Sequence, residues 1–84
     1  MNTEAEIWGY IRKHRETDQT RMVLYHLFFF GPITDMVARD KYGITRLADV
    51  IWKLRRRGFT IDCDLMKKPN RWGRPVTYGV YRLA

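Results

Sequence analysis

The sequence predicts a single α+β domain of 84 residues, in which helices come first and a β-hairpin comes last. Apolar residues recur with a helical period as far as residue 57 and alternate with a period of two after it. Residues 1–45 carry six basic and six acidic side chains, whereas residues 46–84 carry ten and three. The whole net charge of +7 therefore lies in the second half, which is the usual footprint of a protein that binds a polyanion.

Residues 3–15 are predicted to form an amphipathic helix. Thr3 can cap it, and Glu6 follows at the spacing of a capping box. Its apolar stripe consists of Ile7, Tyr10, Ile11 and His14, with Trp8 at the margin. We expect residues 1–17 to be an accessory or dimerisation helix, and residues 18–84 to be the main domain.

A second helix is predicted from a cap at Asp18 to the break at Gly31-Pro32. It is apolar on two sides, so both sides need a cover. One side consists of Val23, Leu24, Leu27 and Phe30, and the other of Met22, Tyr25 and Phe29. Two covers are open for the second side. Either the stripe containing Ile7, Tyr10 and Ile11 packs on Met22, Tyr25 and Phe29 within the chain, or these six residues form a homodimer interface.

Two short helices separated by a glycine-containing turn follow. Ile33 is expected in a very short strand, and Thr34 caps a helix that ends at Tyr42 before Gly43. Thr45 is expected to cap the next helix, which carries the basic run at residues 55–57 and ends at Gly58. This spacing predicts a helix-turn-helix, with a strongly basic second helix.

After Gly58 the alternating pattern predicts a β-hairpin. One strand is expected over residues 59–66 and the other over residues 76–81, with a long basic tip at residues 67–75. A three-helix core followed by such a hairpin is a winged helix-turn-helix, here with an extra N-terminal helix. The single cysteine, Cys63, is expected to be a small core residue of the first strand rather than a nucleophile.

The basic helix is the predicted recognition helix for the major groove of double-stranded DNA. Its core side is expected to hold Ile44, Leu47, Ala48, Ile51 and Leu54, with Trp52 packed at the edge. The predicted DNA-facing residues are Thr45, Arg46, Asp49, Val50, Lys53, Arg56 and Arg57. Arg46 is expected to pair with guanine, Asp49 with cytosine and Val50 with a thymine methyl group, while Lys53 and Arg57 bind phosphates.

The hairpin tip is the second predicted contact. Its candidate residues are Lys67, Lys68, Arg71, Trp72 and Arg74. The cations suit phosphates or a narrow minor groove. For Trp72 two roles stay open: stacking or wedging against DNA, and covering the base of the hairpin.

The sequence resembles the bacteriophage-type winged-helix domain family. The resemblance covers about residues 19–84 and is carried by these segments: Gly31-Pro32-Ile33-Thr34, Tyr42-Gly43-Ile44-Thr45-Arg46-Leu47-Ala48, Gly58-Phe59, Asn70-Arg71-Trp72-Gly73 and Tyr81-Arg82-Leu83. It implies the winged-helix fold and DNA binding. It also implies a phage or prophage origin, hence the cytoplasm of a bacterial host.

Other classes find little support in the sequence. Neither His14 nor His26 has a cysteine or carboxylate cluster at metal-ligand spacing, and no phosphate-binding loop or paired acid-base carboxylates occur. We therefore expect no enzyme activity, cofactor, metal or membrane insertion. The leading hypothesis is a transcriptional regulator or an accessory factor for DNA transactions. A module that binds and modulates a host protein is the alternative, and RNA binding is a third option with weaker support.

Overall fold

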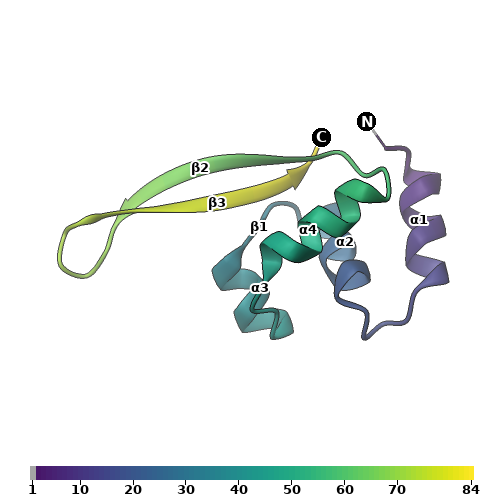
Figure 1. The fold of residues 1–84 in the computed structure, drawn as a ribbon, viewed down its shortest axis with the longest axis horizontal. Coiled ribbons are helices and arrows are strands. Elements are labelled where there is room, and N and C mark those ends of the chain that lie inside the picture. Colours follow the sequence, from purple (N-terminus) through teal and green to yellow (C-terminus); the bar gives the residue numbers. More distant parts are fainter. Residues whose placement is uncertain (1) are drawn as a thin grey trace.

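The computed structural model describes residues 2–84 and consists of four helices and a three-stranded antiparallel sheet (Figure 1). The elements in chain order are α1 (Glu4–Lys13), α2 (Gln19–Phe29), β1 (Ile33–Thr34), α3 (Asp35–Tyr42), α4 (Leu47–Arg56), β2 (Ile61–Pro69) and β3 (Pro75–Leu83). The fold is the predicted winged helix-turn-helix: α3 and α4 form the helix-turn-helix, and β2 and β3 form the wing.

Local capping explains where three of the helices begin. The side chains of Thr3, Asp18 and Thr34 each accept a hydrogen bond from a backbone N–H of the first turn. The α4 helix is different, because Arg46 occupies its N-cap position without a side-chain cap. The prediction that Thr45 caps this helix is therefore wrong. Between α3 and α4, Gly43 has the left-handed conformation that the sequence predicted, with φ of 67°.

One hydrophobic core is shared by all four helices and the base of the sheet. Its buried apolar residues are Ile7, Ile11, Val23, Leu24, Leu27, Ile33, Ala38, Ile44, Leu47, Val50, Ile51, Leu54, Phe59 and Ile61. Phe30 was expected in it but is 65% exposed, because it follows the last turn of α2 as the C-cap and points away from the core.

The α1 helix packs on the rest of the chain through this core. Ile7 and Ile11 are buried, and the ring of Tyr10 lies edge-on to Phe59 at 5.3 Å between centroids. The amide of Asn2 adds two hydrogen bonds beyond the helix: it donates to Gly58 O and accepts from the backbone N–H of Thr60. Three sets of contacts therefore fix α1 beside the C-terminal end of α4.

The second apolar side of α2 is only partly covered. Trp8, rather than the predicted stripe, reaches it and lies edge-on to Phe29 at 5.2 Å between ring centroids. Met22 is half-buried, while Tyr25 and Phe29 stay exposed. Ile7 and Ile11 are buried in the core, so they cannot belong to the predicted homodimer interface of six residues. A homodimer through the exposed Tyr25 and Phe29 stays a prediction.

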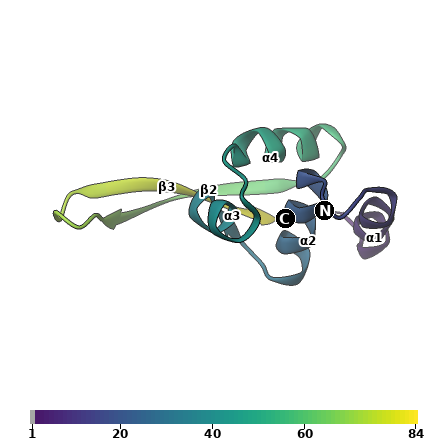
Figure 2. The same ribbon diagram turned by 90° about the horizontal axis from the view of Figure 1, so that it is seen from below.

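The sheet has the order β1-β3-β2, and the wing extends well beyond the helices (Figures 1 and 2). The ladder between β2 and β3 runs from Ile61 opposite Leu83 to Pro69 opposite Pro75. Only its inner end is covered by the helices, so Ile61 is buried but Cys63 is exposed. The prediction that Cys63 is a core residue is wrong for this reason.

Two further features of the described residues bear on function. His26 is buried, its Nδ1 lies 2.7 Å from the hydroxyl of Tyr42, and burial lowers the pKa of the imidazole. No helix in residues 2–84 combines the length and the apolar character that crossing a membrane requires.

Candidate nucleic-acid interface

The α4 helix has one buried side and one exposed, basic side. Leu47, Val50, Ile51 and Leu54 face the core at the spacing of an amphipathic helix. The opposite side presents Asp49, Trp52, Lys53 and Arg56 to solvent. A helix with such an exposed side fits the major groove, which admits an α-helix.

Two residues of this helix lie on the side opposite to the predicted one. Val50, expected to touch a thymine methyl group, is 3% exposed and belongs to the core, so it cannot contact DNA. Ala48, expected in the core, is exposed. The reason is the rotation of the helix about its own axis. Leu47 and Ile51, and likewise Val50 and Leu54, are one turn apart and together form the buried apolar stripe, and Ala48 lies beside this stripe.

Trp52 is the residue that the sequence reasoning missed. It was expected to pack at the edge of the core, but its side chain is 57% exposed. The guanidinium of Arg56, one turn later, lies over its ring at 4.9 Å from the centroid. The four-residue spacing between Trp52 and Arg56 could have indicated this contact from the sequence, because residues four apart are neighbours on a helix.

The N-terminal end of α4 offers a weaker basic site than predicted. Arg46 and Asp49 form an ion pair at 3.8 Å, and both side chains are largely exposed. Such a pair contributes little to stability, but it lowers the net charge of this end of the helix. Thr45 is exposed beside Arg46 in the turn that precedes the helix.

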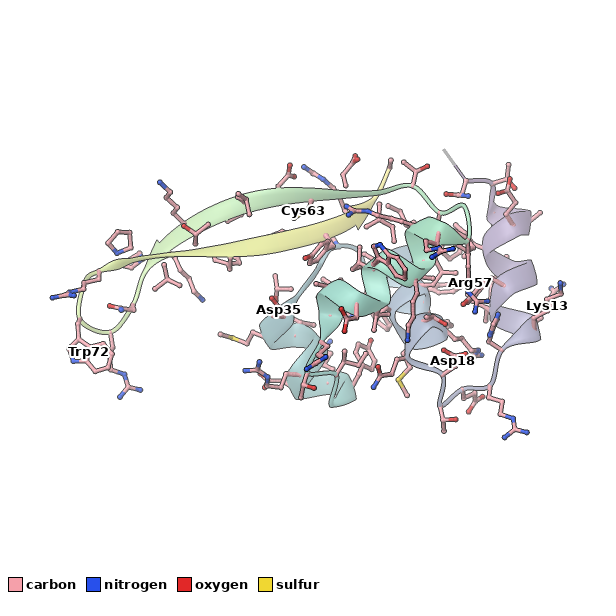
Figure 3. The ribbon with its side chains drawn as sticks, viewed as in Figure 1. Lys13, Asp18, Asp35, Arg57, Cys63 and Trp72 are labelled. Carbon is pink, nitrogen blue, oxygen red and sulfur yellow. The ribbon has the colours of Figure 1, made fainter. Side chains whose placement is uncertain are left out.

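The arginines at the C-terminal end of α4 have different partners. Arg55 donates from Nε and Nη2 to the carbonyl oxygen of Ile61, at 3.1 and 2.7 Å, and so ties α4 to β2. Arg57 lies over the ring of Tyr10, at 5.5 Å from its centroid, and its Nη1 is 3.4 Å from His14 Nε2. Arg57 therefore faces the junction with α1, where Figure 3 shows it.

The wing is more regular than predicted. Lys67 and Lys68 were expected in the tip of the hairpin, but they lie in β2 opposite Thr77 and Val76. Because side chains alternate along a strand, the two lysines point to opposite faces of the wing. The ammonium group of Lys68 lies over the ring of Tyr78 at 5.4 Å from the centroid.

The tip of the wing contains only residues 70–74, and Asn70 fixes it. The side-chain oxygen of Asn70 accepts hydrogen bonds from the backbone N–H groups of Trp72 and Arg74, at 2.9 and 3.0 Å. Gly73 has φ of 78°, a conformation that suits glycine. The short ordered tip holds Arg71, Trp72 and Arg74 at the far end of the molecule (Figure 3).

Trp72 is 77% exposed and lies at the tip, so it does not cover the base of the hairpin. Of its two roles considered above, contact with a ligand is the one that this position allows. The guanidinium of Arg71 lies 5.5 Å from its ring centroid.

Most of the cations after residue 45 are free of acidic partners. Within residues 2–84, Arg46 pairs with Asp49, Arg82 pairs with Asp64, and Arg55 is bound to a backbone oxygen. The remaining seven of the ten are Lys53, Arg56, Arg57, Lys67, Lys68, Arg71 and Arg74. All seven are exposed.

These cations belong to two parts of the molecule that are separated along its long axis, the α4 helix and the wing (Figure 1). The α4 helix stands out on one side, with the wing and α1 to either side of it (Figure 2). The chain is 45 Å long in this direction, which exceeds the rise of roughly 34 Å for one turn of B-DNA. The α4 helix and the wing tip both lie within this length, so they are close enough to reach the same duplex.

A helix-turn-helix followed by a wing, with unpaired cations on both, is the architecture of a DNA-binding domain. The comparisons with known proteins agree with this class. The family model of the winged helix-turn-helix domain matches residues 18–84, so the chain belongs to the winged helix-turn-helix domain family. The match begins at the N-cap of α2, and α1 lies outside it. No curated protein and no solved structure matches the chain.

Domains of this class bind DNA and typically do no chemistry on it. In the described part of the chain, no group of three or more His, Cys, Asp or Glu side chains is close enough to hold a metal ion. Cys63 is exposed on the wing and lies opposite Tyr81 in the ladder between β2 and β3.

Proposed function

We propose that this protein binds double-stranded DNA in a sequence-specific manner, with the exposed side of α4 in the major groove and the wing on the backbone or in the minor groove. The observation that carries the proposal is the set of seven exposed cations without acidic partners on α4 and the wing. The division into an accessory segment, residues 1–17, and a DNA-binding domain, residues 18–84, is part of the proposal.

The biological role that we propose is a transcriptional regulator or an accessory factor in DNA transactions. The resemblance of the sequence to phage-type winged-helix domains supports a phage or prophage origin and action in the cytoplasm of a bacterial cell. Dimerisation on two half-sites, through the exposed rings of Tyr25 and Phe29, is consistent with how many duplex readers bind.

Selection from a pool of random duplexes, repeated at two salt concentrations, tests this proposal. We expect enrichment of a defined motif, and a steep loss of affinity at the higher salt, because each phosphate contact releases counterions. Enrichment of no motif, combined with undetectable duplex binding at low salt, would overturn it.

One observation favours a second candidate function, a module that binds a host protein. The rings of Tyr25, Phe29 and Phe30 are exposed together on α2, away from the core. Exposed aromatic clusters are common at protein interfaces. Stoichiometric capture of one host protein that is lost in a Phe29→Ala/Phe30→Ala variant, without any duplex binding, would favour this function over the first.

A further inference from the structure

Trp52 lies at the middle of α4, on the exposed side of the helix. Its ring is 57% exposed, while its neighbour Ile51 is in the core. Tryptophan has the largest apolar area of any side chain, and covering it on binding stabilises a complex strongly. Nothing in the fold of residues 2–84 requires a tryptophan at this exposed position.

Arg56 packs against this ring. Its guanidinium lies 4.9 Å from the Trp52 centroid, and no acidic side chain among the described residues pairs with it. Stacking on an aromatic face leaves the planar N–H fork of arginine free to donate at its edge. An arginine ordered before binding also loses less side-chain entropy when it binds.

The surroundings of this pair select the chemistry of its ligand. A shallow hollow of about 330 Å³ is lined by Trp52, Lys53, Arg56 and Arg57, a lining that contains three cations and no carboxylate. The nearest acid along the helix, Asp49, is paired with Arg46. The hollow therefore suits a partner with acceptor atoms, apolar surface and nearby negative charge, which are the properties of a base edge in duplex DNA.

We propose that Trp52 and Arg56 form the base-reading pair of α4, an inference that rests on the function proposed above. Arg56 donates two hydrogen bonds to O6 and N7 of a guanine, the acceptor pair that only guanine presents in the major groove. Trp52 packs against the methyl group of a thymine. Lys53 and Arg57, on either side, bind the flanking phosphates. Arg46, at the ion-paired N-cap, is not the main reader.

The distance between the two side chains limits the spacing of the two bases that we propose they contact. The distance of 4.9 Å between the indole centroid and the guanidinium lies between one and two base-pair rises of about 3.4 Å. The thymine therefore lies within two base pairs of the guanine. The selected motif should contain both bases at this spacing.

The test is a selection from random duplexes with the full chain and three variants: Trp52→Leu, Arg56→Lys and, as a control, Lys53→Ala. For the unaltered chain we expect a motif with the guanine and the nearby thymine. Arg56→Lys keeps the charge but loses the fork, so preference for the guanine should fall about 5- to 150-fold, whereas binding to unrelated duplex changes little. Trp52→Leu should lose the preference for thymine.

The control separates reading from general affinity. Lys53→Ala should weaken binding to all duplexes and leave the motif unchanged. All three positions are exposed, so thermal unfolding should confirm an intact fold for each variant. If Arg56→Lys and Trp52→Leu both select the same motif as the unaltered chain, the assignment of the pair is overturned while DNA binding stands. If the unaltered chain binds no duplex, the proposed function itself fails, and the inference fails with it.

Discussion

The tip of the wing allows a quantitative prediction about salt. Changing Arg71→Ala and Arg74→Ala together removes two exposed cations and leaves the turn intact, because Asn70 binds backbone N–H groups that alanine also has. If both arginines contact phosphates, the variant should release about two fewer counterions when it binds a duplex.

The magnitude follows from the number of free cations. We assign Arg56 to a base, and Lys67 and Lys68 point to opposite faces of the wing, so five of the seven can contact phosphates of one duplex. Five phosphate contacts give a slope of log affinity against log salt of about −4.5, and a loss of about 500-fold between roughly 50 and 200 mM salt. The double variant should have a slope smaller in magnitude by about 1.8. Over the same fourfold range its affinity should therefore fall about 12-fold less than that of the unaltered chain.

Fluorescence anisotropy of a labelled duplex across a salt series measures both slopes. The matched control is Arg12→Ala/Lys41→Ala, which changes the net charge equally. In the native chain these two cations lie over the rings of Trp8 and Phe30 and belong to α1 and α3. The control should keep the native slope. An unchanged slope in the tip variant, or an equal reduction in the control, would refute the placement of the wing tip on phosphates.

Three further predictions concern stability. Ile11→Ala should lower the free energy of unfolding by about 2–5 kcal/mol in urea denaturation, because Ile11 joins α1 to the core; a change near zero would mean that α1 is not packed. Arg55→Ala should lower it by about 1 kcal/mol through the lost bonds to Ile61 O, while the adjacent Arg56→Ala should leave it unchanged and weaken DNA binding; equal behaviour of the two would contradict their division of roles. Burial lowers the pKa of the His26 imidazole below its ordinary value of 6.5, so the unfolded state takes up the proton first as the pH decreases. The free energy of unfolding therefore has its full value above pH 6.5. It decreases as the pH falls below 6.5 towards the pKa of the folded state. Unfolding at pH 7 and pH 5 should show a smaller decrease for His26→Gln than for the native chain, and an equal decrease would exclude His26 as the cause.

Much of the fold follows from patterns that act locally. Caps at Thr3, Asp18 and Thr34 and the left-handed Gly43 depend on residues a few positions apart, so the sequence predicts them well. The change from a helical period to alternation marks the wing correctly. These features can be predicted without knowing the tertiary contacts.

The predictions fail where a sequence pattern does not determine which parts of the fold pack against a residue. Alternation along β2 predicts which residues share a face, but not that the helices cover only its inner end, so Cys63 was placed in the core and is exposed. On α4 a helical wheel with apolar residues at 47, 48, 50, 51, 52 and 54 admits more than one phase. Packing selects the phase that buries Val50 and exposes Trp52.

The most direct test of the central claim is an NMR titration of the labelled protein with a duplex that the selection enriches. We expect that backbone amide shifts concentrate on the exposed side of α4, around Trp52 and Arg56, and on the wing tip around Arg71. Tyr25 and Phe29 on α2 should change only with a duplex that carries two half-sites. Shifts centred on Tyr25 and Phe29 instead, or none at all at low salt, would contradict the central claim.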